Sequence, residues 1–302
     1  RIKGRFDELS KIRKYRESVP DWLDILGEKA LGTELWTKEL AALNEQASVI
    51  LRTNTLKTNK AQLQASLEEA GIATEVIKGH PLALQLEQRA NVFVTEAFKN
   101  GWFEVQDASS QLVAAALDVK PGHRVVDCCA GAGGKTLHLA AAMENKGQLI
   151  ALDIYANKLK ELQRRAKRAG AFNIEPRTID STKVIKKLHG SADRVLIDAP
   201  CTGLGVLRRN PDAKWKLEES FIEKITATQK QILQDYSKMV KAGGKMVYAT
   251  CSILPQENSQ QLAHFLNSEA GADFSLVKEQ KVYASKSGYD GFYIALMERK
   301  GS

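Results

Sequence analysis

Hydrophobic and polar positions divide the chain into three successive patterns. Up to about residue 47, apolar residues recur at helical spacing on either side of Pro20, so a helical segment or connector is expected over 1–47. From 48 to 104, apolar runs typical of strands surround one helical run and predict a small α/β domain. Its strands are expected at 48–53, 74–77 and 83–86, and its helix at 60–70.

The third pattern, over 105–302, alternates strand-length apolar runs with longer amphipathic runs. This alternation predicts a doubly wound α/β domain, in which a parallel sheet carries helices on both faces. The last segment, 274–298, has no helical pattern and is expected to add antiparallel strands. The strands are expected at 124–128, 149–153, 175–179, 194–198 and 245–250, and the helices at 135–143, from 154 to Ala169 and at 218–240.

Composition narrows the class of protein. Of 302 residues, 43% are hydrophobic and 26% charged, which excludes collagen-like and disordered chains. No apolar run approaches the roughly 18 residues of a membrane span, and the start does not resemble a signal peptide. Four cysteines are too few for a disulfide framework, so a cytoplasmic protein is expected. Because the chain begins at Arg1 rather than Met, we expect an upstream region in the natural protein.

Basic residues exceed acidic ones and are unevenly distributed. The chain has 44 Lys and Arg against 36 Asp and Glu, a formal net charge of +8. Ten basic residues against three acidic ones lie between Lys158 and Lys187, and seven against two lie between Arg1 and Arg16. Such clusters favour a nucleic acid as the partner.

A glycine-rich turn follows the strand expected at 124–128. Gly131, Gly133 and Gly134 let the backbone approach a ligand, and the following helix N-terminus offers free N–H groups. Position 129 is Cys, so the Walker spacing fails, and position 136 is Thr, so the dinucleotide fingerprint is incomplete. The turn therefore predicts a nucleotide-type site for another ligand.

Aspartates recur at the carboxyl ends of the following strands. Asp153 lies 20 residues beyond Gly133, where an acidic group typically binds ribose hydroxyls. Asp180 and Asp198 end the next two strands. A single such Asp is a common helix cap, but three beside a glycine turn predict a cofactor with ribose hydroxyls and a positive charge.

Two cysteines share the same sheet edge. Cys201 follows the strand that ends at Asp198, and Cys251 follows the strand at 245–250, whereas Cys128 and Cys129 lie within the glycine turn. A free Cys is usually a small buried hydrophobe, which suits Cys128 well and Cys201 and Cys251 less well. No C-x-x-C pair or regular His spacing is present, so we expect no metal site.

Thiols beside a nucleotide-like cofactor indicate nucleophilic catalysis. Carbon 5 of cytosine is a poor nucleophile, but a thiolate that adds to carbon 6 makes it an enamine able to attack an electrophilic methyl group. An acid close to the ring stabilises the charge that develops at nitrogen 3, and Asp198 is three residues from Cys201. Spacing alone leaves open which cysteine attacks.

Six motifs in this order resemble the Sun-type (NSUN) family of RNA cytosine-5 methyltransferases, which use S-adenosylmethionine. The resemblance extends from Ser48 to about Lys300 and is closest to the bacterial ribosomal RNA branch. It implies a Rossmann-like domain with a seven-stranded sheet at 105–302, preceded by a small RNA-binding domain at 48–104. The motifs are LRTN at 51–54, VQDASSQ at 105–111, DCCAGAGGKT at 127–136, DAPCTGLGVLRRNPDAKW at 198–215, YATCSILPQEN at 248–258 and DGFYIALMER at 290–299.

The resemblance also implies catalytic roles. Cys251 would attack carbon 6, and Cys201 would assist proton removal or enzyme release. Asp198 would contact the flipped cytosine and the methionine end of the cofactor, and Lys135 would position the base. An RNA substrate, most simply 16S ribosomal RNA, and a monomeric enzyme are implied; transfer RNA is an alternative substrate.

The cofactor contacts follow the same resemblance. Asp153 would hold the ribose and Asp180 would lie near the adenine. The family usually reads Cys-Ala-Ala-Pro-Gly-Gly-Lys where this chain reads Cys-Ala-Gly-Ala-Gly-Gly-Lys, so a looser loop is expected. Main-chain contacts would come from Cys129, Ala130, Gly131, Ala132, Gly133, Gly134 and Lys135.

Basic residues close to these motifs are candidates for RNA contacts. Arg208, Arg209 and Lys214 follow the Pro-Cys motif and are expected to bind phosphates, with Arg52 a further candidate beside Asn54. Two other functions remain open: a non-catalytic RNA-binding assembly factor of the same fold, and a nucleotide-dependent oxidoreductase. The intact cysteines argue against the first, and the incomplete dinucleotide fingerprint argues against the second.

Overall fold

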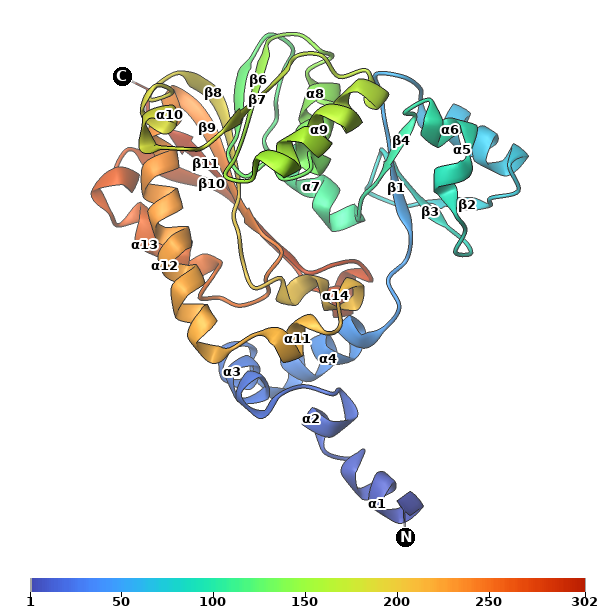
Figure 1. Cartoon of the computed structure of the whole chain (residues 1–302). Helices are drawn as coiled ribbons and strands as arrows, with labels where there is room; N and C mark the ends of the chain where they lie inside the picture. The colour runs from blue at the N-terminus through green and yellow to red at the C-terminus, as the bar shows by residue number, and fades with distance from the viewer. Residues whose placement is uncertain (1, 302) are drawn as a thin grey trace.

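The computed structural model describes residues 2–301 and contains two sheets and an N-terminal group of helices (Figure 1). The N-terminal helices lie at one end of the molecule, below both sheets in the view of Figure 1. They are α1 (Ile2–Leu9), α2 (Arg13–Arg16), α3 (Asp21–Leu31) and α4 (Thr33–Asn44). The helical pattern expected over 1–47 is therefore found in the described part of that segment.

The smaller sheet has four antiparallel strands in the order β2-β3-β1-β4. Leu63 and Leu67 of α5 (Lys60–Glu69) pack on the sheet residues Leu51, Leu84 and Phe103. Three strands and the helix match the sequence prediction, whereas the short β4 was not predicted. The strands are β1 (Ile50–Thr53), β2 (Thr74–Val76), β3 (Ala83–Leu86) and β4 (Phe103–Val105), and η1 (Val92–Val94) and α6 (Glu96–Lys99) precede β4.

The larger sheet has seven strands in the order β10-β11-β9-β8-β5-β6-β7. The five strands from β9 to β7 run parallel, and β11 and β10 close one edge as an antiparallel hairpin. The predicted doubly wound fold with a closing antiparallel segment is confirmed. The strands are β5 (Arg124–Asp127), β6 (Gln148–Asp153), β7 (Ile174–Thr178), β8 (Ala192–Asp198), β9 (Val240–Thr250), β10 (Phe274–Val282) and β11 (Phe292–Arg299).

Helices cover both faces of this sheet, as the buried strands require. Val125 faces a core shared with α7, α8 and α9, and its neighbour Val126 faces a second core shared with α10, α12 and α13. Figure 1 shows the two groups of helices on opposite sides of the strands. The helices are α7 (Ala108–Ala116), α8 (Gly134–Ala142), α9 (Ala156–Ala169), α10 (Thr182–Lys186), α12 (Glu219–Tyr236) and α13 (Ser259–Leu266).

The N-terminal helices α3 and α4 pack on the loops that follow β8 and β9. Buried Leu23, Trp36 and Leu40 form one apolar cluster with Leu207 and Leu254. The same cluster includes α14 (Ala284–Ser287), and η2 (Leu204–Arg209) and α11 (Ala213–Lys216) belong to the loop after β8. Helices α3 and α4 thus pack against the segments that contain the two strand-end cysteines.

Candidate active site

Four parallel strands end at one edge of the large sheet and place the candidate residues there. β5 leads into the glycine turn, β6 ends at Asp153, β8 ends at Asp198 and β9 is followed by Cys251. β5 pairs with both β6 and β8, and β8 pairs with β9. Ligands bind at the carboxyl ends of strands in open parallel sheets, so this edge is the candidate site.

The glycine turn needs its glycines for two different reasons. The backbone is left-handed at Gly131 (φ 55°) and at Gly133 (φ 90°), where a side chain is strained. A Cβ on Gly133 would also lie 2.7 Å from Leu162 Cγ of α9. The turn can therefore pack closely against α9 while its backbone stays open to a ligand.

Asp153 is tied to the glycine turn by its carboxylate. One oxygen accepts a hydrogen bond from the Gly131 N–H at 2.8 Å, and the other accepts from the Tyr155 N–H at 2.8 Å. Each carboxylate oxygen can accept a second bond. Asp153 is thus fixed beside the glycine turn, and its remaining lone pairs suit hydroxyl groups.

A cavity of about 380 Å³ opens between the turn and α12. Asp153 and Asp198 supply acidic groups, and Ile179, Ile232 and Tyr236 supply apolar ones. This volume and this mixture of acidic and apolar lining groups suit a nucleoside with a charged tail. Its remaining lining residues are Cys128, Cys129, Gly131, Ile154, Tyr155, Lys158, Pro200 and Thr228.

The cofactor residues expected from the sequence are only partly brought to this cavity. Cys129, Gly131, Asp153 and Asp198 line it. Asp180 is exposed and is not part of the lining, where its neighbour Ile179 lies instead. Ala130, Ala132, Gly133, Gly134 and Lys135 belong to the turn but do not line the cavity.

Lys135 and Asp198 form an ion pair, with Lys135 Nζ 2.6 Å from Asp198 Oδ2. Burial favours a neutral lysine, but the carboxylate of Asp198 outweighs this effect and raises the pKa of Lys135. Nζ also lies 5.3 Å from the centre of the Phe292 ring. Lys135 therefore stays charged beside the acid that the sequence assigned to the reacting base.

The two strand-end cysteines meet, with Cys201 Sγ 3.4 Å from Cys251 Sγ. Both residues are half-buried. The hydrogen bond with Cys251 and burial raise the pKa of Cys201 well above that of a free thiol. Burial likewise raises the pKa of Cys128 and of Cys129, which lie apart from this pair in the glycine turn.

Asp127 is a site residue that the sequence argument passed over. It ends β5 and is 1% exposed, and its Oδ2 accepts a hydrogen bond from Thr136 Oγ1 at 2.7 Å. Burial raises the pKa of Asp127 to about 7. Asp127 ends its strand, as Asp153 and Asp198 end theirs, so the same sequence pattern could have identified it.

Glu257 is a second residue without a predicted role. It is fully buried behind the cysteines and accepts hydrogen bonds from Thr202, Ser252 and Gln229. It lies within the motif at 248–258, but its partners Thr202 and Gln229 are distant in sequence. The sequence motif identified this segment, but the hydrogen-bond partners of the carboxylate are seen only in the folded structure.

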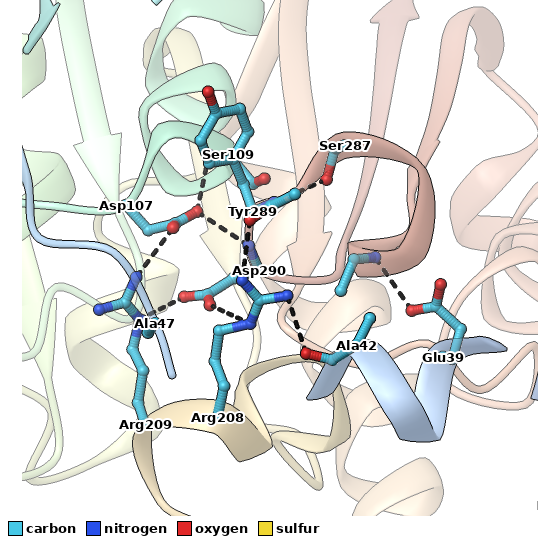
Figure 2. A network of polar contacts seen from close by, with 12 residues as sticks. Glu39, Ala42, Ala47, Asp107, Ser109, Arg208, Arg209, Ser287, Tyr289 and Asp290 are labelled. Atoms are coloured by element: carbon cyan, nitrogen blue, oxygen red, sulfur yellow. Dashed lines mark hydrogen bonds and ion pairs between the residues drawn. The ribbon is translucent and has the colours of Figure 1, made fainter. Parts of the chain in front are cut away.

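The basic residues proposed to bind RNA make contacts within the fold, and Figure 2 shows those of Arg208 and Arg209. The Arg208 side chain is 4% exposed and donates to the carbonyls of Gly288 and Ala42. Lys214 is 4% exposed and donates to the Glu17 carbonyl at 3.0 Å.

Arg52 is also buried, at 2% exposed, and donates to the Gly134 carbonyl at 2.6 Å. Phosphate contacts by Arg52, Arg208 and Lys214 are therefore not supported, because their charged groups face protein carbonyls. Arg209 pairs with Asp107 at 2.8 Å and with Asp290 at 2.5 Å, yet its side chain stays 35% exposed.

The strand order, the glycine turn and the strand-end acids together define a Rossmann-like methyltransferase. The chain belongs to the 16S rRNA methyltransferase RsmB/F family, whose model matches residues 114–298. A model of the ferredoxin-like domain of RsmF/B-like methyltransferases matches residues 19–93. The predicted family and its cofactor, S-adenosylmethionine, are confirmed at this level.

Curated relatives agree with the family model. The chain is 35% identical over 293 residues to ribosomal RNA small subunit methyltransferase B of Proteus mirabilis. The matched region covers 93% of this chain and 66% of the relative. It is 37% identical over 251 residues to a probable methyltransferase B of Synechocystis, covering 82% of this chain and 56% of the relative. The chain thus spans less than two thirds of the length of these two relatives.

Solved structures share the whole arrangement. The structure of the protein PH0851 is similar with a TM-score of 0.90 and 32% identity, covering 97% of this chain and 68% of that one. A methyltransferase homolog protein from Pyrococcus horikoshii has a TM-score of 0.84 and 26% identity, covering 95% and 97% of the two chains. The two-sheet architecture is therefore found in solved relatives.

Proposed function

We propose that this chain methylates carbon 5 of cytosine in RNA, with small-subunit ribosomal RNA as the substrate. The observation that carries the proposal is the pair of thiols, 3.4 Å apart, at the edge that also holds the Lys135–Asp198 ion pair and the nucleoside-sized cavity. When bound, S-adenosylmethionine supplies an electrophilic methyl group. The names of the relatives support the ribosomal substrate.

The residues divide the reaction between them. The Cys251 thiolate forms a bond to carbon 6, and the electron pair displaced to carbon 5 attacks the methyl group. Asp198 relays a proton from the Lys135 ammonium to nitrogen 3, which neutralises the charge that develops on the pyrimidine ring, and takes the proton back when the ring is restored. The proton at carbon 5 then leaves to a base, and the bond between Cys251 and carbon 6 breaks, which restores the thiolate. Cys201, in contact with Cys251, assists this release.

An RNA base reaches these thiols only after leaving its stack. Cys201 and Cys251 are half-buried at the end of the sheet, so a cytosine within a duplex cannot contact them. A flipped or single-stranded cytosine is therefore the proposed substrate. The partly exposed Arg209 and the net charge of +8 support electrostatic contact with the RNA backbone. A monomer acting in the cytoplasm completes the proposal.

The test is methyl transfer from labelled S-adenosylmethionine into RNA of a strain that lacks this protein. Small-subunit ribosomal RNA and transfer RNA form separate arms, and wild type, Cys251→Ala and Cys201→Ala are compared. We expect repeated turnover on cytosine of the ribosomal RNA by wild type alone, no incorporation by Cys251→Ala, and a methylated covalent RNA adduct that accumulates in Cys201→Ala. Full activity of Cys251→Ala would refute the nucleophile, and incorporation only into transfer RNA would refute the substrate.

A further inference from the structure

One buried carboxylate connects the loops of both cysteines. Glu257 is 0% exposed and accepts hydrogen bonds from the Thr202 N–H at 2.9 Å and from Thr202 Oγ1 at 2.6 Å. It also accepts from Ser252 Oγ and, at 3.0 Å, from Gln229 Nε2 of α12. Thr202 directly follows Cys201, and Ser252 directly follows Cys251. The carboxylate is therefore bound to the residue after each thiol.

Burying the Glu257 carboxylate costs free energy, because the group loses its hydration. A buried carboxylate requires several donors to offset its lost hydration. Among the ion pairs of residues 2–301, none includes Glu257, so neutral donors alone surround it. A carboxylate held by the Cys201 loop, the Cys251 loop and α12 locks three elements into one geometry.

Glu257 is one of the connections between the loops of the two thiols. Cys201 and Cys251 follow different strands, β8 and β9, which are neighbours in the sheet. A second bond, from the Gly205 N–H to the Cys251 carbonyl at 2.9 Å, joins the same two loops on their backbone. With Glu257 beneath them, the sulfur atoms stay 3.4 Å apart.

We propose that Glu257 is a positioning residue for the reaction: its carboxylate fixes the Cys201 and Cys251 loops together and so holds the two thiols in the geometry that their different tasks require. This inference rests on the proposed function, because it assigns different tasks to the two thiols. Glu257 does not touch the substrate, since no part of its side chain is exposed.

The charges around the thiols agree with this division. The hydrogen bond with Cys251, burial and the negative charge of Glu257 all raise the pKa of Cys201. A neutral Cys201 can then donate a hydrogen bond to the Cys251 sulfur.

Two substitutions separate the geometric effect from the charge. In Glu257→Gln the amide oxygen can accept from the Thr202 N–H and Gln229, and its NH₂ can donate to the hydroxyls of Thr202 and Ser252, which also accept. The frame is kept and the charge is lost, whereas Glu257→Ala loses both. Glu39→Gln is the matched control, because Glu39 is also 0% exposed and accepts from the N–H groups of Ala284 and Ser285.

The experiment compares alkylation of each cysteine by iodoacetamide between pH 6 and 9, quantified by mass spectrometry of the two peptides, with turnover and cofactor binding measured in parallel. In Glu257→Gln we expect the ratio of Cys201 to Cys251 alkylation to rise about tenfold, because the negative charge that helps to raise the pKa of Cys201 is lost. We expect kcat to fall about tenfold in this variant and about a hundredfold in Glu257→Ala. The dissociation constant of S-adenosylmethionine should change by less than about twofold, because Glu257 does not line its cavity.

The proposal is overturned when alkylation and kcat of both Glu257 variants match wild type, or when Glu39→Gln causes the same changes. Thermal unfolding of all variants shows whether Glu257→Ala is folded, and the Gln variant carries the test where it is not. Alkylation needs no RNA, so it measures the effect of Glu257 on the thiols even if the wild-type protein methylates neither ribosomal nor transfer RNA. That result would refute the proposed function and leave the positioning measurable.

Discussion

Arg165 of α9 donates a hydrogen bond from Nη1 to the carbonyl of Ala132, in the glycine turn, at 2.8 Å. The same guanidinium pairs through Nη2 with Glu104 of β4, also at 2.8 Å, and Glu104 is buried. On the other side of the turn, Arg52 of β1 donates to the Gly134 carbonyl. Residues of the small sheet thus help to hold the glycine turn, at the position where the family usually has proline and this chain has Ala132.

Arg165→Met should weaken binding of S-adenosylmethionine about tenfold. The methionine keeps much of the apolar stem but frees the Ala132 carbonyl, and a charged hydrogen bond contributes about 1.5–3 kcal/mol. Isothermal titration measures the change. Arg164→Met is the control, because its side chain is 79% exposed and pairs only with Glu161 of the same helix. Equal affinities of the two variants would show that the turn does not depend on Arg165.

Gly205→Ala should destabilise the protein by about 1–3 kcal/mol and remove activity. A Cβ at this position would overlap the Gly291 carbonyl and lie 2.8 Å from the Cys251 carbonyl. The Cys251 loop would have to move, and the hydrogen bond between the Gly291 N–H and the Gly205 carbonyl, now 2.7 Å, would be strained.

Thermal unfolding and methyl transfer measure the two effects of Gly205→Ala. Gly4→Ala is the control, because a Cβ there meets nothing within 4 Å. A Gly205→Ala protein with wild-type melting temperature and activity would contradict the close approach of the two loops.

Asp127→Asn should change how stability depends on pH. Burial raises the pKa of Asp127 to about 7 in the folded protein, above the ordinary value of about 3.8. The folded state therefore binds the proton more tightly, so this residue's contribution is fully present below about pH 4 and is lost as the pH rises towards 7. Asparagine is neutral throughout and can still accept from Thr136.

The free energy of unfolding of Asp127→Asn, relative to wild type, should thus increase between pH 4 and 7 by on the order of a few kcal/mol. Urea unfolding at several pH values measures it. A constant difference between the two proteins across this range would contradict the raised pKa.

The inner strands of the large sheet were predictable because they are largely buried and read as short apolar runs. Boundaries failed where tertiary contacts override the local pattern. The helix expected to reach residue 240 ends at Tyr236, since Val240 already belongs to β9. The polar run after Val240 conceals the start of that strand, which pairs with β8 from Ala192 onwards.

The candidate site was predictable where chemistry follows strand ends, and not where partners come from distant segments. Asp153, Asp198, Cys201 and Cys251 were found because each ends or follows a strand. The burial of Arg208 could not be predicted, because one of the carbonyls to which it donates belongs to Ala42 of α4, which is distant in sequence. A sequence shows that a side chain is charged, but burial depends on which segments fold over it.

Lys214→Met should lower the melting temperature and leave RNA affinity unchanged. Lys214 Nζ donates to Asn44 Oδ1 at 2.7 Å and to the Glu17 carbonyl, which also accepts from Asn44 Nδ2. The substitution removes these two bonds of the buried lysine and loosens the N-terminal helices. A loss of about 1–3 kcal/mol is expected. Lys216→Met is the control, because its side chain is 76% exposed.

Thermal unfolding and RNA binding at several salt concentrations separate the structural role of Lys214 from a phosphate contact. A lysine that neutralises a phosphate contributes to the slope of affinity against salt, and its loss reduces that slope by about one. We expect Lys214→Met to keep the wild-type slope while its melting temperature falls. A reduced slope at an unchanged melting temperature would restore Lys214 as an RNA contact and would require the loop after β8 to open when RNA binds.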